Sequence, residues 1–142
     1  MIVSKPIPFE SRTRLRIPLV SSQVKAGFPS PADDHMERSL DLNEHLVKNP
    51  ASTFFVRVQG DSMRDAGISS GDILIVDRSV EAKDRQIVVA MLDGEFTVKR
   101  LRKRAGGVFL EAENKAYPPI EVGENQELVI WGAVTFVIHQ AR

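Results

Sequence analysis

The chain has 142 residues, no cysteine, and 19 basic and 19 acidic side chains that give a formal net charge of zero. This length suits one domain with a short extension, and the 42% of hydrophobic residues can build a core. The lack of cysteine excludes disulfides, thiol catalysis and thiolate metal sites, and it fits a reducing cytoplasm, where we place the protein. No apolar run approaches the roughly 18 residues of a spanning helix, so we expect no membrane association.

The charges are unevenly distributed along the chain. Residues 1–26 hold five basic side chains and one acidic one, a balance of +4, which leaves −4 for the remainder. An acidic remainder argues against strong, sequence-independent binding to the phosphate backbone of DNA. The exception is Lys99–Arg104, where five of six residues are cationic. For this run we favour a solvated strand end before the turn at 105–107 over a nucleic-acid patch.

The N-terminal part is predicted to be an extended arm. Five prolines fall between Ile2 and Pro31, without a sustained helical or strand period. Three arginines alternate with less polar residues from Arg12 to Ile17, which is compatible with a short edge strand. Residues Asp41–Lys48 are compatible with a helical turn or two. We divide the chain into an arm of residues 1–26, a linker of residues 27–50 and a body of residues 51–142.

The body is predicted to be all-β, a compact sandwich or partly open barrel, because short apolar runs alternate with turn residues. Asp93-Gly94 lies between two such runs and predicts a hairpin. In the last run we expect Trp131 and Phe136 to lie in the core. So long a strand leaves sheet edges, which we expect a second copy of the chain to cover. The predicted strands are Thr53–Val58, Asp72–Asp77, Gln86–Leu92, Val108–Ala112 and Leu128–His139.

Ser62 is the candidate nucleophile. It follows the strand at 53–58 through Gln59-Gly60-Asp61, and such a strand-to-turn junction can expose backbone N–H groups that stabilise an oxyanion. We assign that role to the N–H groups around Asp61 and Ser62. Serine is a weak nucleophile and needs an adjacent base, and in isolation Gly-Asp-Ser is a common turn sequence.

Lys99 is the candidate base. It lies on the strand that leaves the predicted hairpin, and period two places Thr97 and Leu101 on the same face. A lysine in mid-strand is usually exposed, because burial of an ammonium costs free energy. The same cost lowers the pKa of a buried lysine, and the neutral amine can then take the proton of a serine hydroxyl.

Ala26-Gly27 is the candidate scissile bond, since small residues allow the backbone to enter a narrow cleft. Thirty-six positions separate Ala26 from Ser62, so cleavage within one chain and between two chains are both compatible with the spacing. The histidines are far apart, and the aspartates lack the spacing of a calcium loop. We therefore expect neither a metal nor a cofactor.

Five ordered blocks resemble the UmuD family, which is related to the LexA repressors. They are Gly27–Ala32, Gly60–Met63, Gly71–Asp77, Asp93–Lys99 and Asn114–Ile120. The resemblance runs from about residue 26 to the C-terminus. It implies a self-cleaving serine endopeptidase with Ser62 as nucleophile, Lys99 as general base and acid, and Ala26-Gly27 as the cleavage site.

The resemblance further implies a role in the DNA-damage (SOS) response. A RecA-type recombinase filament on single-stranded DNA would promote cleavage. The processed homodimer would then join a Y-family polymerase, as a subunit of the polymerase V type, in error-prone translesion synthesis.

There are three alternative functional classes. A LexA-type repressor needs a DNA-reading helix-turn-helix before the cleavage site, and 26 proline-broken residues cannot supply it. A membrane signal peptidase uses a similar dyad but needs an anchor. A noncatalytic dimerisation or polymerase-binding module that retains the motif stays open.

Overall fold

The computed structural model describes residues 1–10, 16–20 and 36–141. For residues 16–20 and 36–38 it describes the backbone alone. The chain separates into two compact units. One unit combines Met1–Phe9 with Asn49–Arg142, and the other is Glu10–Lys48. The candidate scissile bond, Ala26-Gly27, lies outside the described residues.

The smaller unit contains a two-stranded antiparallel sheet of β3 (Arg16–Val20) and β4 (Met36–Asp41), followed by α1 (Leu42–Leu46). The Asp41 side chain accepts a hydrogen bond of 2.9 Å from the Asn43 N–H and caps the helix. The helical turn predicted within Asp41–Lys48 is confirmed. The edge strand predicted from Arg12 to Ile17 is present from Arg16 onward, and its first part lies outside the described residues.

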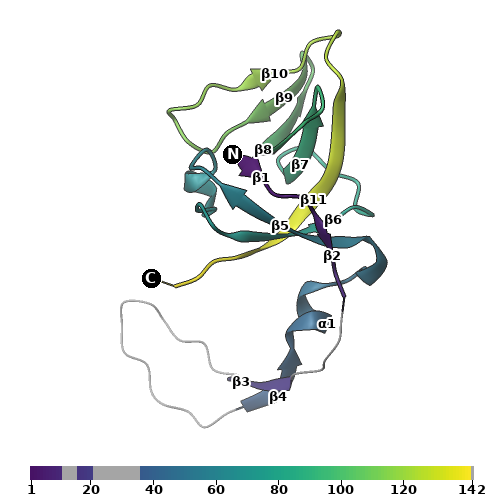
Figure 1. Ribbon diagram of the computed structural model, residues 1–142, viewed down its shortest axis with the longest axis vertical. Coiled ribbons are helices and arrows are strands. Elements are labelled where there is room, and N and C mark those ends of the chain that lie inside the picture. The colour runs from purple at the N-terminus through teal and green to yellow at the C-terminus, as the bar shows by residue number, and fades with distance from the viewer. Residues whose placement is uncertain (11–15, 21–35, 142) are drawn as a thin grey trace. The chain divides into compact units, whose positions relative to one another are not determined.

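The larger unit is an antiparallel β-sheet, so the prediction of an all-β body is confirmed (Figure 1). Among the described residues the order of strands is β1-β5-β6-β11-β7-β8-β9-β10, and β2 also pairs with β5. Two short 3₁₀ helices, η1 (Pro50–Ser52) and η2 (Arg64–Ala66), flank β5. The strands are β1 (Ile2–Val3), β2 (Ile7–Pro8), β5 (Thr53–Gln59), β6 (Ile73–Asp77), β7 (Ile87–Leu92), β8 (Glu95–Arg104), β9 (Gly107–Glu111), β10 (Ile120–Glu121) and β11 (Leu128–Ile138).

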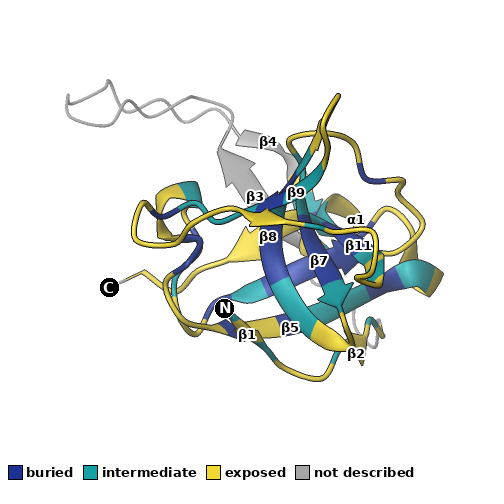
Figure 2. Cartoon of the chain, turned by 90° about the horizontal axis from the view of Figure 1, so that it is seen from above, coloured by how far each residue is buried: buried dark blue, intermediate teal, exposed yellow. Residues whose placement is uncertain are grey.

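The core consists of two clusters of buried aliphatic residues, to both of which β7 and β8 contribute. Val89 and Val98 belong to one cluster, and Val88 and Leu101 belong to the other. Figure 2 shows the buried stretches of both strands. Because β8 is covered on both faces at its middle, any polar residue there must find partners inside the protein.

The hairpin predicted at Asp93-Gly94 is present between β7 and β8. Both residues have positive φ, 50° for Asp93 and 84° for Gly94, as the tight turns of two-residue hairpins require. The turn fixes the register that pairs Lys99 with Val88.

The expectations for the last strand are only partly met. Trp131 packs against the core, but Phe136 is 36% exposed, so its predicted core position is wrong. The pairing of β11 with β6 shifts register between Val134 and Phe136, and such a bulge reverses the inward and outward alternation. In addition, β11 pairs with β6 and β7 on its two sides, so it is not the sheet edge that we expected.

The first nine residues include two strands that extend the sheet at β5. Ile2 and Val3 of β1 pair with Gln59 and Val58, while β2 pairs with the other end of β5 (Figure 1). Phe9 adds an edge-to-face contact with Phe55 at 5.9 Å between ring centroids. No helix in the described parts of the chain has the length and apolar character needed to cross a membrane.

Candidate active site

Ser62 lies in a tight turn that follows β5. Gly60 has a φ of 104°, a conformation that favours glycine, and the Arg64 N–H donates to the Asp61 carbonyl at 3.1 Å. Gly67, with a φ of 80°, ends η2 in the left-handed conformation. The Ser62 side chain is buried, with the residue 1% exposed.

A loop that follows β9 holds this turn in place. The Asn114 side-chain amide donates to the Asp61 carbonyl at 2.8 Å, and the Tyr117 hydroxyl donates to Asp61 Oδ1 at 2.6 Å. Asn114 is itself buried, and its Oδ1 accepts from the Ala116 N–H at 3.0 Å. The bond to Asp61 raises the pKa of Tyr117. The residue before the nucleophile is thus fixed through both its backbone and its side chain.

The same loop connects the turn to β8. The Asp65 N–H donates to the Glu113 carbonyl at 2.8 Å, and the Glu113 N–H donates to the sulfur of the buried Met63 at 3.4 Å. The Glu113 carboxylate forms an ion pair with Arg100, the residue that follows Lys99. The contacts of Glu113 therefore hold both the turn that carries Ser62 and the strand that carries Lys99.

Lys99 reaches Ser62 from the middle of β8. Its Nζ lies 3.2 Å from Ser62 Oγ, 3.1 Å from Thr97 Oγ1 and 3.1 Å from the Val98 carbonyl oxygen. The residue is 5% exposed. The structure therefore brings together the two side chains selected from the sequence.

Burial lowers the pKa of Lys99 from its usual 10.5, because the ammonium is removed from water. A hydrogen bond with the α-amino group of Met1 acts in the opposite direction but is the smaller effect. Since the pKa is lowered, the neutral amine becomes populated at a lower pH than in a free lysine. Burial of the ammonium destabilises the folded protein at low pH, and this stability returns as the pH rises from the lowered pKa to that of a free lysine. A neutral amine hydrogen-bonded to a serine hydroxyl can act as its general base.

Comparison with known proteins is consistent with this chemistry. A family model for Peptidase S24-like proteins matches residues 18–135. The chain belongs to the Peptidase S24-like family. This is a family of serine peptidases, so the prediction that the protein is an enzyme is confirmed.

Several curated relatives align over most of this S24 peptidase. Protein SamA of Salmonella typhimurium strain LT2 is 44% identical over 135 residues, which cover 95% of this chain and 94% of SamA. Protein MucA of Escherichia coli is 43% identical over 120 residues, covering 84% and 82%. A LexA repressor of Shewanella denitrificans is 42% identical over 130 residues, covering 91% of this chain and 62% of the repressor.

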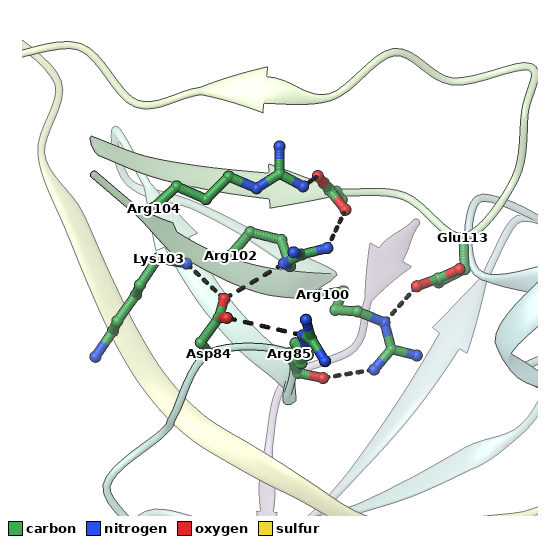
Figure 3. Close-up of polar contacts among 8 residues, drawn as sticks. Asp84, Arg85, Arg100, Arg102, Lys103, Arg104 and Glu113 are labelled. Carbon is green, nitrogen blue, oxygen red and sulfur yellow. Dashed lines mark hydrogen bonds and ion pairs between the residues drawn. The ribbon is translucent and has the colours of Figure 1, made fainter. Parts of the chain in front are cut away.

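The three arginines of the basic run on β8 are paired with carboxylates in this S24 peptidase (Figure 3). Arg102 contacts Asp84 at 3.3 Å and Glu111 at 3.4 Å, and Arg104 contacts Glu111 at 2.9 Å. Arg100 is held by Glu113 and also donates to the Arg85 carbonyl at 2.6 Å. The arginines thus form an ion-paired strand end, which agrees with the preference for a strand end over a nucleic-acid patch. Lys99, at the start of the run, is buried, so the solvated interpretation is wrong for that residue.

Sequence reasoning did not identify three residues that line or hold the site. Thr97 accepts from Lys99, and Asn114 and Tyr117 hold Asp61. Thr97 was placed on the face of Lys99 by period two, and that shared face was the available signal. Asn114 and Tyr117 lie in a block that carries the family resemblance, but nothing local connects them with a turn more than 50 residues earlier.

Proposed function

We propose that this S24 peptidase cuts its own Ala26-Gly27 bond, with Ser62 as nucleophile and Lys99 as general base and then acid. The observation that carries the proposal is the 3.2 Å contact between Lys99 Nζ and Ser62 Oγ in a buried setting that lowers the lysine pKa. Lys99 lies on β8 and Ser62 in the turn that follows β5, a strand of the same sheet, so their spacing is fixed before any substrate arrives.

The reaction proceeds in two stages. Neutral Lys99 takes the hydroxyl proton as Ser62 Oγ bonds to the carbonyl carbon of Ala26, which gives a tetrahedral oxyanion. When the bond to the Gly27 nitrogen breaks, Lys99 returns the proton to the leaving amine. Water then attacks the Ser62 ester while Lys99 takes its proton, and Lys99 returns that proton to Ser62 Oγ as the acyl bond breaks and the carboxylate of Ala26 is released.

Backbone N–H groups of the nucleophile turn are the candidates for stabilising the oxyanion. Within the described residues, the N–H groups of Ser62 and Met63 have no hydrogen-bond acceptor, whereas those of Arg64 and Asp65 are occupied. N–H groups held in place and unoccupied before the reaction provide transition-state stabilisation without reorganisation.

Cleavage at this bond would release a basic segment of residues 1–26 from a body of residues 27–142 whose net charge is −4. In this proposal residues 27–50 form a linker and residues 51–142 form the catalytic β body. The negative balance supports weak binding of the body to DNA at physiological salt.

The resemblance to the UmuD family and the similarity to SamA and MucA support a role in the cytoplasmic DNA-damage response. A RecA-type filament on single-stranded DNA would promote cleavage, and a Y-family polymerase would be the partner of the processed form. Exposed apolar residues near the end of β11, Val137 and Ile138, support a homodimer because a second copy would remove them from water.

The test is incubation of purified protein at alkaline pH, followed by mass spectrometry. The expected product begins at Gly27 and has 116 residues, which is 142 minus 26. A different new N-terminus, or no product even with a recombinase filament, would contradict the proposal. The second result would favour the noncatalytic dimerisation or polymerase-binding module.

A further inference from the structure

Strand β1 lies in the cleft that leads to the candidate dyad. Its residues pair with the edge of β5 on one side and contact β8 on the other. Met1 and Val3 pack against the core cluster, while Ile2 points outward and is 69% exposed. A pocket of about 570 Å³ remains beside the strand, lined by β1, β8 and Tyr117.

The start of the strand covers the reacting groups. The Met1 amino group is hydrogen-bonded with Lys99, and burial together with the charge of Lys99 lowers the pKa of this amino group. Met1 also lies against Gly60 of the nucleophile turn, because a Cβ placed on Gly60 would be 3.5 Å from the Met1 Cα, an ordinary van der Waals distance. With Ser62 1% and Lys99 5% exposed, a peptide carbonyl has no access to Ser62 Oγ in this arrangement.

The attachment of β1 to the sheet is short. Only Ile2 and Val3 form the β1 ladder, although Ser4 adds a backbone hydrogen bond to the Arg57 carbonyl at 2.8 Å. Strand β2 is anchored separately through Ile7 and Pro8 at the far end of β5. Residues 1–3 can thus leave the cleft while β2 stays in the sheet.

We propose that β1 is an autoinhibitory strand that occupies the place of the cleavage segment, so that self-cleavage requires residues 1–3 to leave the cleft. This inference rests on the proposed function, because it concerns access to the same dyad. The edge of β5 accepts one extended strand at a time, and main-chain pairing is available to β1 and to a cleavage segment alike. The rate of cleavage then scales with the fraction of molecules in which β1 is displaced.

A reversible cross-link tests this directly. Ile2 and Gln59 are paired across the ladder and both are exposed, and the chain contains no natural cysteine. Directly paired residues in an antiparallel ladder have Cα atoms about 4.5 to 5.5 Å apart, within the range of disulfides. The double variant Ile2→Cys, Gln59→Cys therefore provides a lock, and Ile2→Cys alone is the matched control.

In the oxidised double variant the Ala26-Gly27 bond should be cut at least tenfold more slowly than in the same protein after reduction. Samples are quenched and then reduced before mass spectrometry, because the disulfide would otherwise keep residues 1–26 attached to the cut body. The single variant should cleave at one rate under both conditions. Equal rates for the oxidised, fully cross-linked protein and its reduced form would overturn the inference. Wild-type protein that never cleaves would instead overturn the proposed function, so the two failures are distinguishable.

A second pair of variants does not depend on disulfide formation. Val3→Asp removes the inward-facing anchor of β1, while Ile2→Asp changes the exposed neighbour on the same strand. Val3→Asp should speed self-cleavage several-fold at a fixed alkaline pH, and Ile2→Asp should leave the rate near that of the wild type. A folded Val3→Asp protein that cleaves no faster than Ile2→Asp would contradict the proposal.

Discussion

The two halves of β8 place similar side chains in opposite surroundings. Lys99 is buried, its Nζ contacts three neutral oxygen atoms and the α-amino group of Met1, and among the described residues it has no carboxylate partner. The cations that follow, Arg100, Arg102 and Arg104, lie closer to solvent and are paired with carboxylates (Figure 3). One strand therefore carries a lysine whose charge is disfavoured and arginines whose charge is balanced.

The difference shows how position on one strand sets chemistry. A carboxylate beside Lys99 would favour its charged form and remove its capacity to accept a proton. The arginines keep their charge at any usable pH, and their pairing holds the loop and strand that surround the site. Removing the Lys99 side chain, in the inner half of β8, should therefore alter the reaction. Removing an arginine from the outer half, Arg100–Arg104, should lower the stability slightly.

The largest expected effect comes from the dyad itself. Ser62→Ala and Lys99→Ala should each lower the rate of self-cleavage by about a thousandfold or more, and the double variant should be no worse, because the two groups act as a unit. Lys99→Arg should fail equally, since a guanidinium stays protonated. Rates are measured from the appearance of the Gly27 fragment, and near-normal cleavage by Lys99→Arg would exclude the lysine as base.

A smaller effect on the cleavage rate is expected from Asn114, whose side chain holds the turn that carries Ser62. Asn114→Ala leaves the Asp61 carbonyl without its side-chain donor, and the loss of a buried hydrogen bond costs about 1 to 3 kcal/mol. We expect a lower midpoint of urea unfolding and about a tenfold slower cleavage at saturating pH. Lys115→Ala, at the exposed neighbouring position, is the control and should change neither quantity. Unchanged cleavage in Asn114→Ala would show that the turn keeps its geometry without this contact.

The smallest effect belongs to the outer half of the strand. Arg104→Ala removes a half-exposed side chain and its contact with Glu111, and such surface pairs are worth about 0.2 to 1 kcal/mol. The free energy of unfolding should fall by no more than this, and the cleavage rate should be unchanged. A large loss of activity would mean that the two halves of β8 are not separable as described.

Much of the fold was predictable because its signals are local. The hairpin at Asp93-Gly94 follows from residues that tolerate positive φ, and it alone places Lys99 near the middle of a strand. Phe136 was misplaced because a bulge after Val134 interrupts the alternation, and a bulge has no distinct pattern in this sequence. Strand β1 is only two residues long, which is too short for any periodic signal.

The site, like the fold, has parts that the sequence predicted and parts that it did not. Ser62 and Lys99 could be selected as a pair from their residue types and the family resemblance, and the structure places them in contact. The support from Asn114 and the coverage by Met1 come from segments remote in sequence, so only the folded chain brings them to the site. Local patterns thus identified the reacting groups but not what holds or covers them.

The dependence of the self-cleavage rate on pH tests the central claim that a buried, neutral Lys99 is the base. Because burial lowers the lysine pKa from 10.5, the rate should rise with pH as the amine loses its proton and should level off below that value. The profile is measured on wild-type protein from neutral to strongly alkaline pH, with folding checked at each point. A rising curve with such a plateau is the predicted result, and a rate independent of pH over this range would contradict the account.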